Sequence, residues 1–150
     1  MTQVTNPSAV ALVLRRTFDA PRETVFKAWT DPAIMQQFLG PANRGCKNVQ
    51  VDLRAGGAYR IVMDGPDGED FIAKGIYREV VVPERVVCTW LWEEDDPSQE
   101  HETLLTLEFI AKGNQTELVL THENFKDAES CERHTEGWMA ILDAYAKLIA

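Results

Sequence analysis

The sequence predicts an α+β fold in which a curved antiparallel sheet packs against one long C-terminal helix. Three observations lead to this prediction. Residues 128–150 carry apolar side chains at spacings of three and four, the stripe of an amphipathic helix. Residues 46–122 instead alternate between apolar and polar side chains, as half-buried strands do. Between residues 21 and 40, two short stretches with helical apolar spacing each begin at a proline, which is favoured at the first helical position.

The predicted elements follow one another in a simple order. A first strand at 10–18 leads into two short helices at 21–29 and 32–38, and Asp31 can cap the second of them. Gly40 and Pro41 end that helix, and a hairpin loop is expected at 64–68. Residues 1–9 are expected to be flexible, and the chain 1–150 to be one domain. Six consecutive antiparallel strands are predicted, at 49–53, 59–63, 71–82, 85–93, 103–110 and 118–122.

The C-terminal helix has two unusual residues beside its apolar stripe. Asp127 can cap its first turn, and Trp138 lies near the centre of the stripe. His134 falls within the stripe, and Gly137 sits at its edge, where alanine would be the better helix former. Because Ser130, Gly137 and Ala144 are seven residues apart, we expect a strip of small side chains. The two short helices are expected to pack on it and bury Phe26 and Phe38.

Composition excludes several classes of partner. The net charge is −9, and the acidic excess lies in residues 61–150, which argues against nucleic acid binding. Cys46, Cys88 and Cys131 form an odd set without a CxxC motif, so a reducing compartment is expected. The first residues do not resemble a signal peptide, and no apolar run is long enough to span a membrane. We therefore expect a cytoplasmic protein with no nucleic acid partner and no membrane span.

A cavity is expected between the sheet and the long helix. A long meander of strands must twist, whereas a helix is nearly straight, so the two cannot pack flat against each other. The side chains expected there are large, and aromatic residues with polar tips are typical of small-molecule pockets. The alternative is that the same residues fill the space completely as a core. The candidates for the cavity are Phe26, Trp29, Phe38, Tyr59, Met63, Tyr77, Trp90, Trp92, His122, His134 and Trp138.

Six stretches also resemble a known family: 16–32, 52–59, 75–79, 89–92, 120–125 and 134–138. In order, they read RTFDAPRETVFKAWTDP, DLRAGGAY, GIYRE, TWLW, LTHENF and HTEGW. They are similar to small bacterial proteins related to the C-terminal domain of the heat-shock chaperone ATPase activator. These proteins belong to the helix-grip (START-like, SRPBCC) superfamily. The resemblance implies a curved sheet that encloses a cavity with the C-terminal helix. The superfamily includes lipid and hormone carriers, polyketide cyclases and dehydratases, and chaperone cofactors.

Three functions follow as expectations. The first is non-catalytic binding of a small hydrophobic or aromatic molecule, without a cofactor. The second is a cyclase- or dehydratase-like enzyme in which His122 or His134 acts with Tyr59 or Tyr77 on a bound substrate. The third is a chaperone-linked or self-associating interaction module, for example a homodimer.

The two histidines also have simpler interpretations. A hydrogen-bonded pair of His122 and His134 would tie the last strand to the helix, because buried polar groups need partners. Cys131 and His134 lie one turn apart and could bind a metal together with His122, but the sequence offers no fourth ligand. We therefore expect no metal site.

Overall fold

The computed structural model describes residues 2–40, 46–65 and 67–149. Pro41 after the second helix, Pro66 in the hairpin loop and Ala150 at the end of the last helix lie outside the described residues. The elements are β1 (Gln3–Ser8), β2 (Ala11–Phe18), α1 (Arg22–Thr30), α2 (Pro32–Phe38), β3 (Cys46–Val51), β4 (Ala58–Asp64), β5 (Asp70–Val81), β6 (Arg85–Trp92), a 3-10 turn (Pro97–Gln99), β7 (Thr103–Lys112), β8 (Gln115–Glu123) and α3 (Ala128–Ile149).

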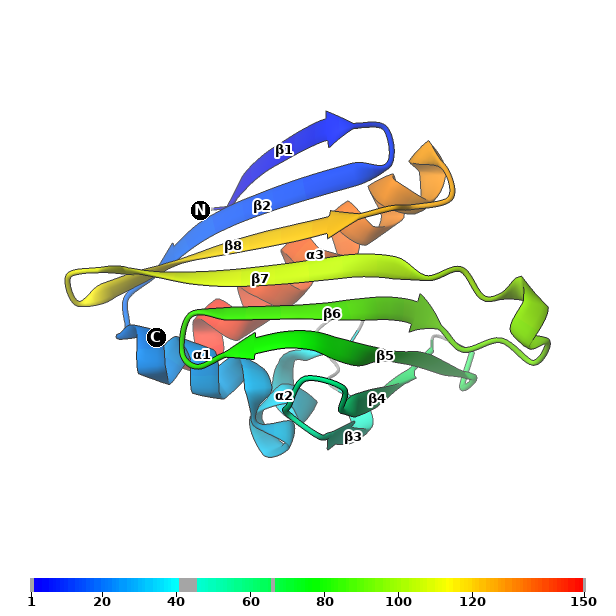
Figure 1. Ribbon diagram of the computed structural model, residues 1–150, viewed down its shortest axis with the longest axis horizontal. Helices are drawn as coiled ribbons and strands as arrows, with labels where there is room; N and C mark the ends of the chain where they lie inside the picture. Colours follow the sequence, from blue (N-terminus) through cyan, green and yellow to red (C-terminus); the bar gives the residue numbers. More distant parts are fainter. Residues whose placement is uncertain (1, 41–45, 66, 150) are drawn as a thin grey trace.

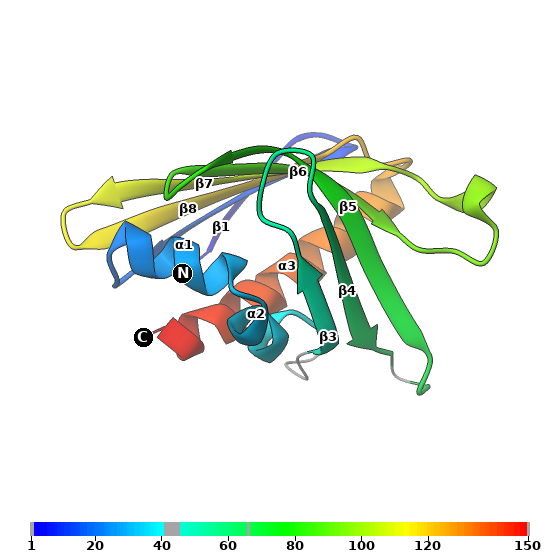
Figure 2. The same cartoon turned by 60° about the horizontal axis from the view of Figure 1, so that its bottom comes forward.

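The strands form one antiparallel sheet in the order β1-β2-β8-β7-β6-β5-β4-β3 (Figure 1). The predicted six-strand meander is therefore confirmed as β3 to β8, and β2 closes against β8 through eight residue pairs from Ala11↔Glu123 to Phe18↔Thr116. All three helices lie on the same side of the sheet, and strands β3 to β5 bend around them (Figure 2). This is the predicted α+β helix-grip architecture.

The start of the chain differs from the prediction. Instead of a flexible segment, Gln3–Ser8 form edge strand β1, which pairs with β2 from Gln3↔Arg15 to Ser8↔Ala11. Every residue of β1 is exposed, so the strand has no apolar alternation for sequence reasoning to detect. Main-chain pairing with β2 orders it instead.

The long helix begins and packs as predicted, except at Gly137. Asp127 accepts the backbone N–H of Ser130 at 2.8 Å and so caps the first turn. Cys131, Trp138 and Tyr145, seven residues apart, are at most 3% exposed and form the buried face. Gly137 is exposed, and a β-carbon added to it would have no neighbour within 4 Å. The prediction that a helix packs on Gly137 is therefore wrong.

The two short helices bury their aromatic residues elsewhere. Phe26 of α1 packs against Phe109 of β7, with ring centroids 5.1 Å apart. Phe38 of α2 packs against Tyr145 at 4.8 Å, and the Tyr145 hydroxyl donates a hydrogen bond to the carbonyl of Val25. The short helices therefore pack against the buried face of α3, at Tyr145, and not against the strip of small residues that contains Gly137.

Candidate ligand cavity

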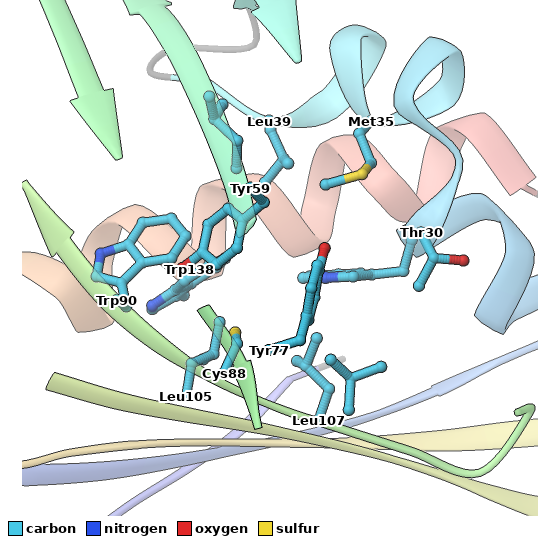
Figure 3. Close-up of a pocket in the computed structure, with 13 residues that line it drawn as sticks. Thr30, Met35, Leu39, Tyr59, Tyr77, Cys88, Trp90, Leu105, Leu107 and Trp138 are labelled. Carbon is cyan, nitrogen blue, oxygen red and sulfur yellow. The ribbon is translucent and has the colours of Figure 1, made fainter. Parts of the chain in front are cut away.

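A cavity of about 30 Å³ lies between the concave face of the sheet and the helices (Figure 3). It is roughly large enough for one water molecule. Its lining is mainly apolar and comes from α1, α2, four strands and α3. The lining residues are Trp29, Thr30, Met35, Leu39, Tyr59, Ile61, Tyr77, Val86, Cys88, Trp90, Leu105, Leu107 and Trp138.

Strand alternation accounts for the lining from the sheet. Side chains two residues apart on a strand share a face, as Val86, Cys88 and Trp90 do on β6. The antiparallel register then places Cys88 opposite Tyr77 on β5 and opposite Leu105 on β7. The expected alternation, together with this register, thus brings side chains of β5, β6 and β7 together on one side of the cavity.

The sheet is irregular beside the cavity, where Gly75 lies opposite Tyr59. The β5–β6 pairing passes from Lys74↔Leu91 directly to Tyr77↔Cys88. In the gap, the N–H of Ile76 donates to the side-chain oxygen of Thr89 at 2.9 Å, and the Thr89 carbonyl accepts the hydroxyl of Tyr59. A β-carbon on Gly75 would collide with that carbonyl, so only glycine leaves room for the Tyr59 ring.

The cavity holds hydroxyl groups of two kinds. Thr30 and Tyr59 donate to main-chain carbonyls, those of Phe26 at 2.9 Å and of Thr89. Tyr77 is 5% exposed, and its hydroxyl has no hydrogen-bond partner among the described residues. The hydroxyl points into the space between the sheet and α2 (Figure 3). Burial raises the pKa of Tyr59 and Tyr77 and raises the pKa of the Cys88 thiol to about 12, so all three groups are neutral.

His122 is fully hydrogen-bonded behind the cavity. Its Nδ1 accepts the indole N–H of Trp138 at 2.9 Å, which places the ring proton on Nε2. Nε2 then donates to the hydroxyl of Thr103 at 2.6 Å, and that hydroxyl donates to the carbonyl of Trp90 at 2.7 Å. Burial, and next the nearby His134, lower the pKa of His122 well below its usual value. His122 is therefore a neutral link between β8, β7, β6 and α3.

His134 is held in the same way with the opposite tautomer. Its Nε2 accepts the indole N–H of Trp92 at 2.8 Å, and its Nδ1 donates to the carbonyl of Ser130 at 2.8 Å. Burial lowers its pKa as well. The two imidazole rings lie edge to face, 5.2 Å apart, so they contact but do not hydrogen-bond to each other. The prediction of a hydrogen-bonded pair of His122 and His134 is therefore wrong: Trp138 and Trp92 donate to the two rings, and the bond from Trp138 to His122 ties the last strand to the helix.

The structure brings together only part of the predicted set of cavity residues. Those that line the cavity are Trp29, Tyr59, Tyr77, Trp90 and Trp138. Phe26, Phe38 and Met63 are buried in the core away from it, and Trp92, His122 and His134 form the hydrogen-bond network behind it. Sequence reasoning missed Met35 and Leu39, although their helical spacing marked them as apolar, and missed Cys88, Leu105 and Leu107, which follow from the strand alternation.

Cys131 does not join the histidines in a metal site. Within residues 2–40, 46–65 and 67–149, no three His, Cys, Asp or Glu side chains converge as metal ligands would.

In the same residues, no helix is both long enough and apolar enough to cross a membrane.

Comparison with known proteins adds the family. Residues 19–150 match the model of the Activator of Hsp90 ATPase homolog 1-like protein family. Among solved structures, a protein from Chromobacterium violaceum is 28% identical, with a TM-score of 0.84 over 95% of this chain and 98% of that one. The AHSA1 protein from Silicibacter pomeroyi is 30% identical, with a TM-score of 0.77 over 91% and 95%. A protein from Rhodobacter sphaeroides, 23% identical, has the same fold, with a TM-score of 0.82 over 99% and 94%.

No match was found among curated proteins. The family model nevertheless covers most of the sequence, and the relatives are matched over nearly their full lengths. The chain therefore belongs to the Activator of Hsp90 ATPase homolog 1-like family, in the helix-grip SRPBCC superfamily.

Proposed function

We propose that the protein binds a small apolar molecule, without catalysis, in the cavity between the sheet and α3. The observation that carries the proposal is the cavity lining, which gathers Trp29, Tyr59, Trp90 and Trp138 around one space. Aromatic walls with few polar groups are typical of small-molecule sites. The helix-grip fold is itself of a ligand-binding type.

The hydrogen bonds of the histidines favour binding over catalysis. A general acid or base must reach the reacting atom of the substrate. Both ring nitrogens of His122 and of His134 are already bonded to protein groups, and neither residue lines the cavity. A cyclase- or dehydratase-like reaction would have to break this network before either ring could transfer a proton.

The size of the cavity sets a further condition. Ligand pockets usually measure about 300–1,000 Å³, and this cavity measures about 30 Å³. The ligand must therefore displace lining side chains as it enters. Met35 is the best candidate to move, because its unbranched thioether chain adapts easily to new shapes. In Figure 3 it lies with Leu39 on the side of the cavity opposite Leu105 and Leu107.

The test is quenching of tryptophan fluorescence by a chemically broad set of apolar probes, with a cavity-filling variant beside a matched control. Leu105→Phe places extra volume in the cavity, whereas Leu104→Phe makes the same change on the opposite face of β7. We expect saturable binding by the wild type and Leu104→Phe, and none by Leu105→Phe, with circular dichroism confirming that both variants fold. Equal binding by the two variants would place the site elsewhere, and no saturable binding to the wild type would refute the proposal. Native mass spectrometry of the same samples reports the stoichiometry and any homodimer.

A further inference from the structure

Tyr77 is the lining residue whose hydroxyl has no hydrogen-bond partner among the described residues. Of the three hydroxyl-bearing side chains around the cavity, Thr30 and Tyr59 donate to carbonyls. The Tyr77 hydroxyl makes no hydrogen bond within the described part of the chain, although its side chain is almost completely buried. The Tyr77 hydroxyl is not among the fully buried polar atoms without a partner, so it keeps accessible surface. It is therefore directed into the cavity, where it is available to a ligand (Figure 3).

The chemistry of this group defines what it can bind. A phenol hydroxyl is a good hydrogen-bond donor, and burial keeps Tyr77 protonated by raising its pKa. Its complement is a hydrogen-bond acceptor. Among the described residues the lining includes no Lys, Arg or His, so a carboxylate or phosphate would lose its hydration there without gaining an opposite charge from them.

Resting on the proposed function, we infer that the ligand carries an uncharged hydrogen-bond acceptor, such as a carbonyl or ether oxygen, which the Tyr77 hydroxyl binds. Tyr77 is then a specificity-determining residue, and the remaining walls contact the apolar body of the ligand. The indole nitrogen of Trp90, which is fully buried without a partner among the described residues, does not share this role. It lies on the side of its ring away from Tyr77 (Figure 3).

Two probes of nearly the same shape test this inference. Acetophenone has a carbonyl where α-methylstyrene has a methylene group, so the pair differs chiefly in the acceptor. Their dissociation constants are measured by calorimetry for the wild type, for Tyr77→Phe and for Tyr145→Phe. The last variant is the control, since it removes a buried hydroxyl whose bond to Val25 lies outside the cavity.

We expect Tyr77→Phe to weaken acetophenone binding about 2- to 12-fold, the equivalent of one hydrogen bond, and not to weaken α-methylstyrene binding. Comparing the two probes cancels general effects of the substitution, as in a double-mutant cycle. Tyr145→Phe should leave the ratio of the two constants unchanged.

A second measurement needs no variant. The infrared carbonyl stretch of acetophenone bound to the wild type should move to lower frequency than in hexane, because a hydrogen bond weakens the C=O bond. Equal loss of both probes in Tyr77→Phe, or a bound carbonyl stretch at the hexane frequency, would overturn the inference and leave the proposed binding intact. Failure of both probes to bind the wild type would refute this inference, whereas the proposed function falls only when the broad probe set also fails.

Discussion

Trp138 of α3 donates its indole N–H to Nδ1 of His122 on β8 at 2.9 Å. One side chain thus joins the long helix to the sheet by a hydrogen bond and also packs on the aromatic wall of the cavity, 5.0 Å from the ring of Trp90. The helix and the sheet are therefore held together at the cavity itself.

Trp138→Ala is expected to lower the free energy of unfolding by about 3–5 kcal/mol, the usual loss for a buried aromatic side chain. Met139→Ala, one residue along the helix at a site 38% exposed, is the matched control and should cost less than about 1 kcal/mol. Urea titration measures both. Similar losses in the two variants would show that Trp138 does not anchor the helix.

Stability should fall as the pH is lowered below about 6.5, the usual pKa of histidine in an unfolded chain. The pKa values of His122 and His134 are lowered in the folded state, so below pH 6.5 the unfolded chain binds more protons. The two histidines contribute their full share to the free energy of unfolding above about pH 6.5. This share is lost as the pH falls from about 6.5 to their pKa values in the folded state. The loss can reach about 1.4 kcal/mol per pH unit for each histidine.

The measurement is urea titration between about pH 7.5 and pH 5. Carboxylates also begin to titrate in this range, so the difference between the wild type and His134→Gln isolates the contribution of one ring. We expect the variant to have the shallower dependence. Parallel curves would mean that His134 binds protons equally in both states.

Two tyrosine substitutions should affect stability in opposite ways. Tyr59→Phe removes the donor to the carbonyl of Thr89 and should cost about 1 kcal/mol or more, because that carbonyl loses its partner. Tyr77→Phe removes a hydroxyl without a partner among the described residues and should be neutral or stabilising. Thermal unfolding compares the two variants directly. A clear loss of stability in Tyr77→Phe would reveal a hydrogen bond in the free protein.

Two glycine-to-alanine substitutions should also differ in sign. Gly137→Ala lies on an exposed helix face with free space around it and should stabilise the protein by up to about 1 kcal/mol. Gly75→Ala should destabilise it by about 1–3 kcal/mol or more, because the added carbon would lie 2.8 Å from the Tyr59 ring and collide with the main chain of Thr89. Denaturant midpoints decide both. Destabilisation by Gly137→Ala would indicate a neighbour that packs on this face.

The sequence predicted elements well wherever burial is periodic. The stripe through Cys131, Trp138 and Tyr145 and the alternation along β4 depend only on which face is buried, and both are confirmed. Strand β1 was missed because main-chain pairing orders it without burying its side chains. The spacing of apolar residues along the sequence thus predicts which side chains are buried, but it does not predict strands that are held by backbone hydrogen bonds alone.

The site was predicted less completely because several contacts depend on three-dimensional distances. Spacing identified His122 and His134 as inward-facing but could not show that Trp138 and Trp92 supply their hydrogen bonds. The prediction that the short helices pack on the strip around Gly137 was wrong for a related reason. A strip of small residues shows where a neighbour would fit, but not whether one lies there. Phe38 and Phe26 of the short helices pack against Tyr145 and Phe109 instead.

The interruption between β5 and β6 has a mechanical consequence. At Ile76 the backbone N–H of β5 donates to the side-chain oxygen of Thr89 on β6 in place of direct backbone pairing, and Tyr59 of the neighbouring strand β4 donates to the Thr89 carbonyl. Side-chain bonds can break and re-form without shifting the strand register, so we expect this part of the sheet to bend more easily than its neighbours. It runs along the wall of the cavity, where bending would enlarge the interior while the rest of the sheet stays paired.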